Sequence, residues 1–238
     1  MTVPGPLTDP VQARRVRRFW PLISGVIAVL LAAAIGLIIA LRDNGAPTEI
    51  DTDWMDEIIE HRSPIWTVPS LFMNYLGGGI VGVFVVPIAV IVALLLFRRR
   101  WAALYFLIAS VLSAGLVQLL KATFGRARPS EILVSADFGS FPSGHTANAA
   151  TIAVCLAIVF PRVWVWAAGA AYVVLMLLSR TYLGAHWLTD TLAGMLIGAG
   201  VAVIVWAPFA VKLWEERAKP HRFVWAKPRA STSGGGAA

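Results

Sequence analysis

The sequence predicts an all-α integral membrane protein with six transmembrane helices. Of its 238 residues, 58% are hydrophobic and only 14% are charged, which is far from the composition of a soluble globular domain. Several apolar runs come close to the roughly 20 residues that a helix needs to cross the hydrocarbon core of a bilayer. Charged clusters separate these runs. We therefore expect one compact polytopic domain rather than a set of soluble domains.

The first apolar run, residues 20–41, has 22 residues and no charge. It is longer than the apolar region of a signal peptide, so it predicts an uncleaved first span. Five further runs predict the remaining spans: residues 78–97, 101–120, 146–160, 163–178 and 188–211. Between the first two spans, residues 42–76 mix seven carboxylates with tryptophan and isoleucine, which is typical of a short helix lying at the membrane interface.

The distribution of charge predicts the orientation of the chain. There are 20 Lys and Arg against 13 Asp and Glu, a formal charge of +7. In a soluble protein this excess would suggest nucleic acid as a partner. Here, with six spans, 14 cations fall on the side of the two termini and six on the other, so the bilayer is the expected partner and nucleic acid is not. The positive-inside rule then predicts that both termini are cytoplasmic.

This orientation divides the chain into three parts. Residues 1–19 and 212–238 are expected to be basic cytoplasmic tails, and residues 20–211 the membrane domain. The last eight residues, STSGGGAA, have the composition of a flexible linker, so the end of the second tail is expected to be disordered. The only cysteine, Cys155, excludes an intramolecular disulfide. No motif assigns an oligomeric state.

Three short polar stretches stand at the ends of predicted spans, all on the extracytoplasmic side. They are KATFGRARP at residues 121–129, PSGH at residues 142–145 and SRTYLGAHWLTD at residues 179–190. A phosphate dianion is held by positive charges and hydrogen-bond donors around its oxygens, and Lys121, Arg128 and Arg180 supply permanent charge for the anion and its transition state. The stretches therefore predict a site that binds and cuts a phosphate ester at a membrane surface.

The other residues of these stretches suit the same chemistry. Ser143 and Gly144 lead into the fourth span, where a turn at a helix N-terminus exposes N–H groups to an anion and the serine hydroxyl adds a donor. His186 and Asp190 are four residues apart and would share one face of a helix. A carboxylate bonded to one imidazole nitrogen fixes the tautomer and leaves the other nitrogen free to attack.

In order, spacing and placement, the three stretches resemble the signature motifs of the type-2 phosphatidic acid phosphatase superfamily. The resemblance covers residues 101–211 and implies a metal-independent lipid phosphatase with no cofactor, built on the helical core shared with haloperoxidases. It also implies that His186 attacks phosphorus to form a phosphohistidine and that His145 protonates the leaving oxygen. The haloperoxidases that share these motifs are soluble and use vanadate, so six spans exclude that activity here.

The expected substrate is a membrane lipid phosphate, with its tail in the bilayer and its headgroup at the motifs. Polyprenyl diphosphates, phosphatidylglycerol phosphate and phosphatidic acid all fit this description. Only 12 residues lie between Pro129 and Pro142, which leaves little room for a headgroup-recognising insertion and favours broad specificity. The alternatives are a phosphotransferase that uses the same site with another acceptor and a non-enzymatic protein that binds or transports lipid phosphates.

Simpler interpretations accompany the functional ones. Lys121, Arg128 and Arg180 could only mark the ends of spans, and His186 and Asp190 could be a structural pair. Arg126 matches no signature position and is expected to contact lipid headgroups or solvent rather than the transferred phosphate. The acidic segment 43–60 is most simply a solvated face, with a cation site or a headgroup-selecting lid as the alternatives.

Overall fold

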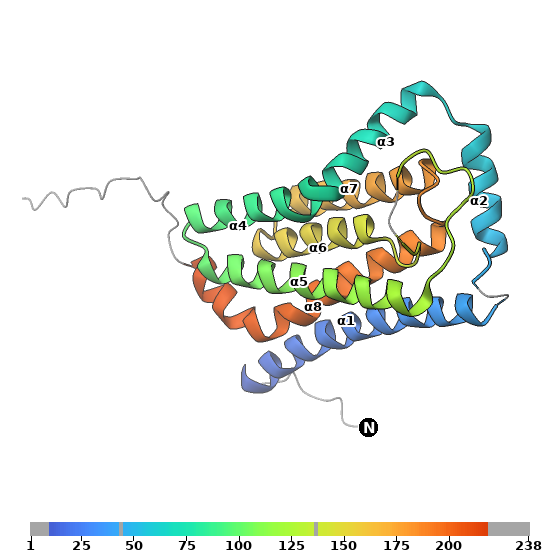
Figure 1. Ribbon diagram of the computed structural model, residues 1–238. Helices are drawn as coiled ribbons and strands as arrows, with labels where there is room; N and C mark the ends of the chain where they lie inside the picture. The colour runs from blue at the N-terminus through green and yellow to red at the C-terminus, as the bar shows by residue number, and fades with distance from the viewer. Residues whose placement is uncertain (1–9, 43–44, 136–137, 219–238) are drawn as a thin grey trace, which may run out of the picture.

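The computed structural model describes residues 10–42, 45–135 and 138–218, and all regular structure in them is helical. The predicted all-α class is therefore confirmed for the described part of the chain. The elements run as a sequence of α-helices with one π-helical segment, η1 (Figure 1). They are α1 (Pro10–Leu41), α2 (Glu49–Glu60), α3 (Pro64–Gly77), η1 (Val81–Val85), α4 (Val86–Leu96), α5 (Arg100–Phe124), α6 (Gly144–Val159), α7 (Val163–Tyr182) and α8 (Leu188–Ala218).

Helix length supports four or five membrane spans among the described residues rather than an established six. Four helices are long and apolar enough to cross a bilayer: α1 over Phe19–Leu41, and α5, α7 and α8. A fifth span is possible where α3 and the η1–α4 segment form a pair bent by 53°. Helix α6 is apolar but has only 16 residues, shorter than a typical span.

The prediction for the region between the first two predicted spans is wrong in detail. A single short interfacial helix was expected, but residues 49–77 form two helices, and the second of these, α3, is apolar and continues through a bend toward α4. The bend falls at three successive glycines, of which Gly79 has φ +57, a left-handed conformation that favours glycine. Helix α3 therefore meets α4 at an angle: its start stands outward from the bundle and its end lies near α7, as Figure 1 shows.

The short helix α6 lies at the centre of the bundle and packs against α5, α7 and α8, while α1 packs along α8 (Figure 1). Its sequence is rich in alanine, and glycines of α8 face it. At Gly198, an added Cβ would come within 2.1 Å of the Ala147 carbonyl oxygen, so only glycine permits this approach. Close packing of small residues is a usual way for membrane helices to associate.

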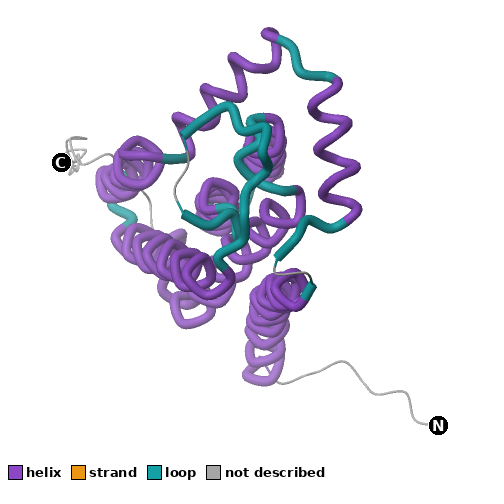
Figure 2. Tube along the Cα trace, turned by 45° about the vertical axis from the view of Figure 1, so that its right-hand side comes forward, coloured by secondary structure: helices purple, strands orange, loops and turns teal. Residues whose placement is uncertain are grey.

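One end of the bundle carries the long loop between α5 and α6 and the short loop between α7 and α8. Figure 2 shows these loops gathered in front of the helix ends. Helix α5 ends at Phe124 and is capped by Gly125, whose φ of +54° is the left-handed conformation that glycine adopts readily. At the opposite end, α8 continues to Ala218, beyond residue 211 where the last span was expected to end. The predicted tails before residue 10 and after 218 lie outside the described residues.

Candidate active site

The three polar stretches converge on a cavity of about 700 Å³ at the loop-bearing end of the bundle. Five of the predicted site residues line it: Lys121, Gly144, His145, Arg180 and His186. Gly144 is the first residue of α6. Much of the remaining wall is apolar and comes from η1, α4 and α5, with residues such as Phe84, Ile88, Leu107 and Val111. The cavity is therefore cationic at one end and apolar along the rest.

Two of the predicted phosphate-binding cations share a main-chain acceptor. Lys121 lies in the last turn of α5 with only 5% of its surface exposed, and its Nζ donates to the Gly139 carbonyl at 2.8 Å. Arg128 Nη2 donates to the same carbonyl at 2.9 Å, and its Nη1 donates to the Ala185 carbonyl at 2.5 Å. The loop before α6 therefore fixes both cations and joins the first stretch to the third.

His186 is held by the neighbouring main-chain carbonyl. Its Nδ1 lies 2.7 Å from the Ser140 carbonyl oxygen. Because a carbonyl oxygen only accepts hydrogen bonds, Nδ1 must carry the proton, and the lone pair is on Nε2. Nε2 lies 3.4 Å from Arg128 Nη1. The nitrogen with the lone pair thus lies next to a cation of the first stretch, an arrangement compatible with the predicted attack on a phosphate bound there.

The surroundings of His186 keep its imidazole neutral. Burial, followed by the positive charges of Arg180, Arg128 and Lys121, lowers the pKa of His186 well below its usual range. The hydrogen bond to Ser140 acts in the opposite direction but does not offset these effects. A neutral imidazole is the form that can act as a nucleophile, so the cations that suit a phosphate also favour the form of His186 that the predicted attack needs.

Asp190 lies beside His186 but does not orient it as the i, i+4 spacing predicted. Its Oδ2 is 3.7 Å from His186 Nδ1, beyond hydrogen-bond distance, and instead accepts from the Trp187 backbone N–H at 2.9 Å. The Ser140 carbonyl takes the place that the carboxylate was expected to fill. The physical reason is that His186 precedes the first residue of α8, Leu188, so the two side chains do not share a helix face.

The environment of the Arg126 side chain differs most from the one predicted from the sequence. Its side chain is 1% exposed and bridges two buried carboxylates: Nη1 lies 2.6 Å from Asp190 Oδ1, and Nη2 lies 2.7 Å from Asp51 Oδ2. Its Nη1 also donates to Thr189 Oγ1 at 2.8 Å. The expectation of a headgroup or solvent contact for Arg126 is therefore wrong. The guanidinium is a structural link between α2 and the start of α8.

Asp51 is buried, although segment 43–60 was expected to form a solvated face. It is fully buried, and its carboxylate accepts from the Thr189 backbone N–H at 2.9 Å and from Thr48 Oγ1 at 2.9 Å. Burial by itself would raise the pKa of Asp51. Hydrogen bonds from Thr189 and Arg126, together with the Arg126 charge, outweigh burial and hold that pKa below its usual value. The neighbouring carboxylate of Asp53 is exposed, as the sequence predicted for the segment.

His145 and Arg180 meet at Asn74 of α3, a residue that the sequence analysis did not single out. His145 Nε2 lies 3.2 Å from the Asn74 carbonyl oxygen, and Arg180 Nη1 donates to the Asn74 side-chain oxygen. A Cβ on Gly78, at the end of α3, would come within 2.1 Å of His145 Nε2, so glycine is required there. The one available signal in the sequence was an asparagine inside the otherwise apolar stretch of α3.

Ser143 has a structural role that the sequence did not anticipate. The residue is fully buried and forms the N-cap of α6, where its Oγ accepts from the Thr146 backbone N–H at 3.4 Å and from Thr146 Oγ1 at 3.1 Å. Its own N–H donates to the Asp190 carbonyl at 2.9 Å, which ties the second stretch to the third. A contact between its hydroxyl and phosphate remains a prediction.

Within the described residues, one group of three possible metal ligands lies close together: Glu57, Glu60 and His61, all exposed at the end of α2. None belongs to the three stretches. The permanently charged side chains that line the cavity are Lys121 and Arg180, which suit an anion rather than a divalent metal.

Comparison with known proteins identifies the family of the chain. The model of the PAP2 superfamily matches residues 102–214. The undecaprenyl-diphosphatase of Sulfolobus acidocaldarius is 32% identical over 126 residues, which cover 49% of this chain and 60% of the relative. The lipid A 1-phosphatase of Rhizobium johnstonii is 32% identical over 46% of this chain and 49% of its own length. The chain thus spans about half to three fifths of these two relatives.

A longer match and two solved structures extend the comparison. The phosphatidylglycerophosphatase B of Bacillus subtilis is 30% identical over 58% of this chain and 71% of its own length. The crystal structure of a transmembrane PAP2-type phosphatidylglycerolphosphate phosphatase from Bacillus subtilis superposes with a TM-score of 0.65 at 25% identity, covering 84% of this chain and 99% of that one. Aquifex aeolicus LpxE gives 0.59 at 29% identity, covering 65% and 93%. The chain belongs to the PAP2 superfamily, the family of type-2 phosphatidic acid phosphatases.

Proposed function

We propose that the protein is a membrane phosphatase that hydrolyses a phosphomonoester or diphosphate of a membrane lipid, without a metal, through a phosphohistidine on His186. The observation that carries this proposal is the cavity itself. Its cationic end, with Lys121, Arg180 and His186, suits a phosphate group, and its apolar wall along α4 and α5 suits a lipid tail. The relatives named as phosphatases of lipid phosphates support the same class of substrate.

The reaction follows from the protonation states at the site. Nε2 of His186 attacks phosphorus, a P–N bond forms, and the P–O bond to the lipid breaks as His145 donates a proton to the leaving oxygen. Water then attacks the phosphohistidine while His145 takes up its proton. Inorganic phosphate leaves and the Nε2 lone pair returns. Lys121, Arg128 and Arg180 stabilise the charge on the nonbridging oxygens in both steps, which is where most of the catalysis of phosphoryl transfer arises.

The proposed orientation places this site outside the cell. The stretches lie at the end of the bundle opposite the last turn of α8, and the excess of cations lies on the side of the termini. By the positive-inside rule we assign both termini to the cytoplasm and the site to the extracytoplasmic face.

Phosphate release from defined lipids tests the function. Purified protein is expected to release inorganic phosphate, in the presence of EDTA, from undecaprenyl diphosphate, phosphatidylglycerol phosphate, phosphatidic acid or lipid A 1-phosphate. The lipid with the highest kcat/KM identifies the natural substrate class. Activity that disappears with EDTA and returns with a divalent ion would contradict the metal-independent site. Phosphate that leaves the donor only when a second lipid or glycan accepts it would indicate a phosphotransferase.

The rate is expected to depend on pH as a bell-shaped curve. The acid limb of kcat/KM reports His186 in the free enzyme, and because its pKa is lowered, activity should persist below the usual histidine value of about 6.5. The alkaline limb reports loss of the His145 proton. Comparing a monoester with a diphosphate lipid separates ionisation of the enzyme from that of the substrate. A profile that is flat from acid to alkaline pH, or an acid limb above the usual histidine value, would be inconsistent with these roles.

A further inference from the structure

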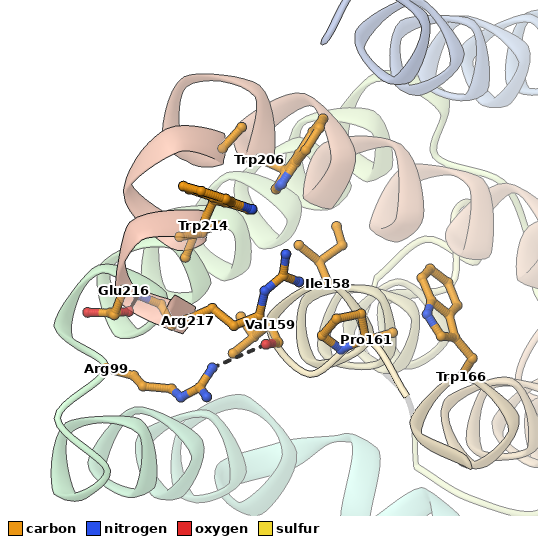
Figure 3. A pocket seen from close by; sticks show the side chains of 13 residues that line it. Arg99, Ile158, Val159, Pro161, Trp166, Trp206, Trp214, Glu216 and Arg217 are labelled. Atoms are coloured by element: carbon orange, nitrogen blue, oxygen red, sulfur yellow. Dashed lines mark hydrogen bonds between the residues drawn. The ribbon is translucent and has the colours of Figure 1, made fainter. Parts of the chain in front are cut away.

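A second cavity, of about 260 Å³, lies at the end of the bundle opposite the candidate active site. Figure 3 shows it from close by. Its walls come from the start of α5, the end of α6, the first turns of α7 and the last turns of α8. Nothing in the proposed reaction uses this cavity. Its lining is nonetheless unusual for a helix end, because it combines two arginines with three tryptophans.

The two arginines enter the cavity from different helices. Arg99, at the N-cap of α5, donates from Nη1 to the Val159 carbonyl at 3.2 Å, and its guanidinium lies 4.6 Å from the centre of the Phe160 ring. These contacts hold the guanidinium in one orientation. Arg217 comes from the last turn of α8, and Figure 3 shows its guanidinium reaching into the space beside Val159. Among the described residues, the Arg217 side chain has no hydrogen-bond or ion-pair partner.

The one carboxylate among the lining residues, Glu216, accepts hydrogen bonds from the backbone. Glu216 is buried, and its two oxygens accept from the backbone N–H groups of Trp101 and Ala102 at 3.0 and 3.1 Å. Figure 3 shows its side chain directed away from the space that Arg217 enters. The positive end of the α5 helix dipole compensates much of the negative charge of Glu216. Positive charge from the two arginines therefore remains in excess in the cavity.

The charge around Arg99 supports the same conclusion. Burial lowers the pKa of Arg99, Glu216 opposes this, and the like charges of Arg217 and Arg162 lower it further. Three arginines, Arg99, Arg162 and Arg217, thus outnumber the single carboxylate Glu216 here, so a further anion would be stabilised. The structure therefore favours an anionic ligand at this position.

The tryptophans indicate where the anion comes from. Trp166 of α7 and Trp206 and Trp214 of α8 line the cavity, and Trp166 and Trp214 are 50% and 61% exposed. Tryptophan is enriched at the level of lipid headgroups, where its ring is amphipathic. The cavity therefore lies at headgroup depth in the leaflet at this end of the bundle, where anionic phospholipids are the abundant anions.

We propose that this cavity binds the phosphate headgroup of an anionic phospholipid, whose acyl chains remain in the adjoining leaflet. Arg99 and Arg217 would bind the phosphate oxygens, for which planar guanidinium forks are well suited. The volume admits a headgroup but not a whole lipid. Basic pockets between helices at a membrane surface are known to hold anionic headgroups. This inference does not depend on the proposed phosphatase activity.

The test measures lipid binding to the full-length protein in phosphatidylcholine nanodiscs. Short-chain phosphatidylglycerol is titrated and the bound lipid is counted by native mass spectrometry. The double variant Arg99→Gln/Arg217→Gln is expected to raise the half-saturating concentration by roughly tenfold or more. Arg100→Gln, an exposed cation next to Arg99 and outside the cavity lining, serves as the matched control and should bind as the wild type does.

Two further measurements distinguish loss of the lipid site from misfolding and from a site for soluble anions. The single variant Arg217→Gln changes an exposed side chain, so it should weaken binding while the thermal unfolding midpoint without added lipid stays the same. Inorganic phosphate and glycerol phosphate should not displace the lipid. Equal binding by wild type and double variant would overturn the proposal. Displacement by either soluble anion at concentrations similar to those of the lipid would instead assign the cavity to soluble phosphate compounds.

Discussion

His186→Ala is expected to abolish phosphate release, lowering kcat/KM by roughly 10³- to 10⁶-fold, as removal of a nucleophile does in other covalent mechanisms. The reason is geometric: Nδ1 is bonded to the Ser140 carbonyl, so Nε2 presents the lone pair beside Arg128. An alanine leaves the cations and the cavity in place but no atom to attack phosphorus. Initial rates with a lipid phosphate in EDTA measure the effect.

Two variants serve as controls for this prediction. His61→Ala removes an exposed histidine at the end of α2 and should leave the rate unchanged. His145→Ala should lower the rate by roughly 10²–10⁴-fold, because a general acid contributes less than the nucleophile. Substantial activity in His186→Ala, close to that of the wild type, would show that water attacks phosphorus directly or that another residue is the nucleophile.

Asp51→Asn is expected to have the largest effect on stability. The substitution leaves the Arg126 guanidinium buried with one carboxylate instead of two, and breaking a buried ion pair typically costs about 3–5 kcal/mol. Arg126 also positions Asp190, whose backbone carbonyl binds the N-cap of α6, so kcat should fall as well. Thermal unfolding followed by intrinsic fluorescence should show a midpoint lower by about 10 °C.

The control for Asp51 is Asp53→Asn, which removes an exposed carboxylate from the same helix two residues away. It should change neither the unfolding midpoint nor the rate. Rates are measured well below both midpoints, so that a loss of activity in Asp51→Asn reports the position of Asp190 and not unfolding. An Asp51→Asn protein with the stability and rate of the wild type would show that the Arg126 bridge to α2 is dispensable.

Much of the fold follows from the sequence because apolar runs and charged ends define membrane helices directly. The expected spans at residues 101–120 and 163–178 correspond to α5 and α7, which extend only a few residues further. The segment before the second predicted span was harder to predict. Pro64–Gly77 is apolar but short, and only packing against α7 and the bend at the glycines make it part of the helical bundle.

The sequence predicted which residues line the site, but it did not predict which groups they form hydrogen bonds with. Lys121, Arg180 and both histidines line one cavity, as their placement at span ends indicated. The roles of main-chain groups were not predictable, because no side chain marks the carbonyls of Gly139 and Ser140 that hold the cations and His186. The long-range bridge from Arg126 to Asp51 was hidden for a different reason: a carboxylate in an acidic segment does not differ, in sequence, from its solvated neighbours.

The most direct test of the proposed mechanism is to trap the phosphoenzyme. Protein is mixed with a radiolabelled lipid phosphate in EDTA, quenched within the first turnover in alkali, and digested for peptide mapping. The account predicts an alkali-stable, acid-labile label on the peptide that contains His186, and no label in His186→Ala. Release of labelled inorganic phosphate without any label on the protein, or a label on a different residue, would contradict it.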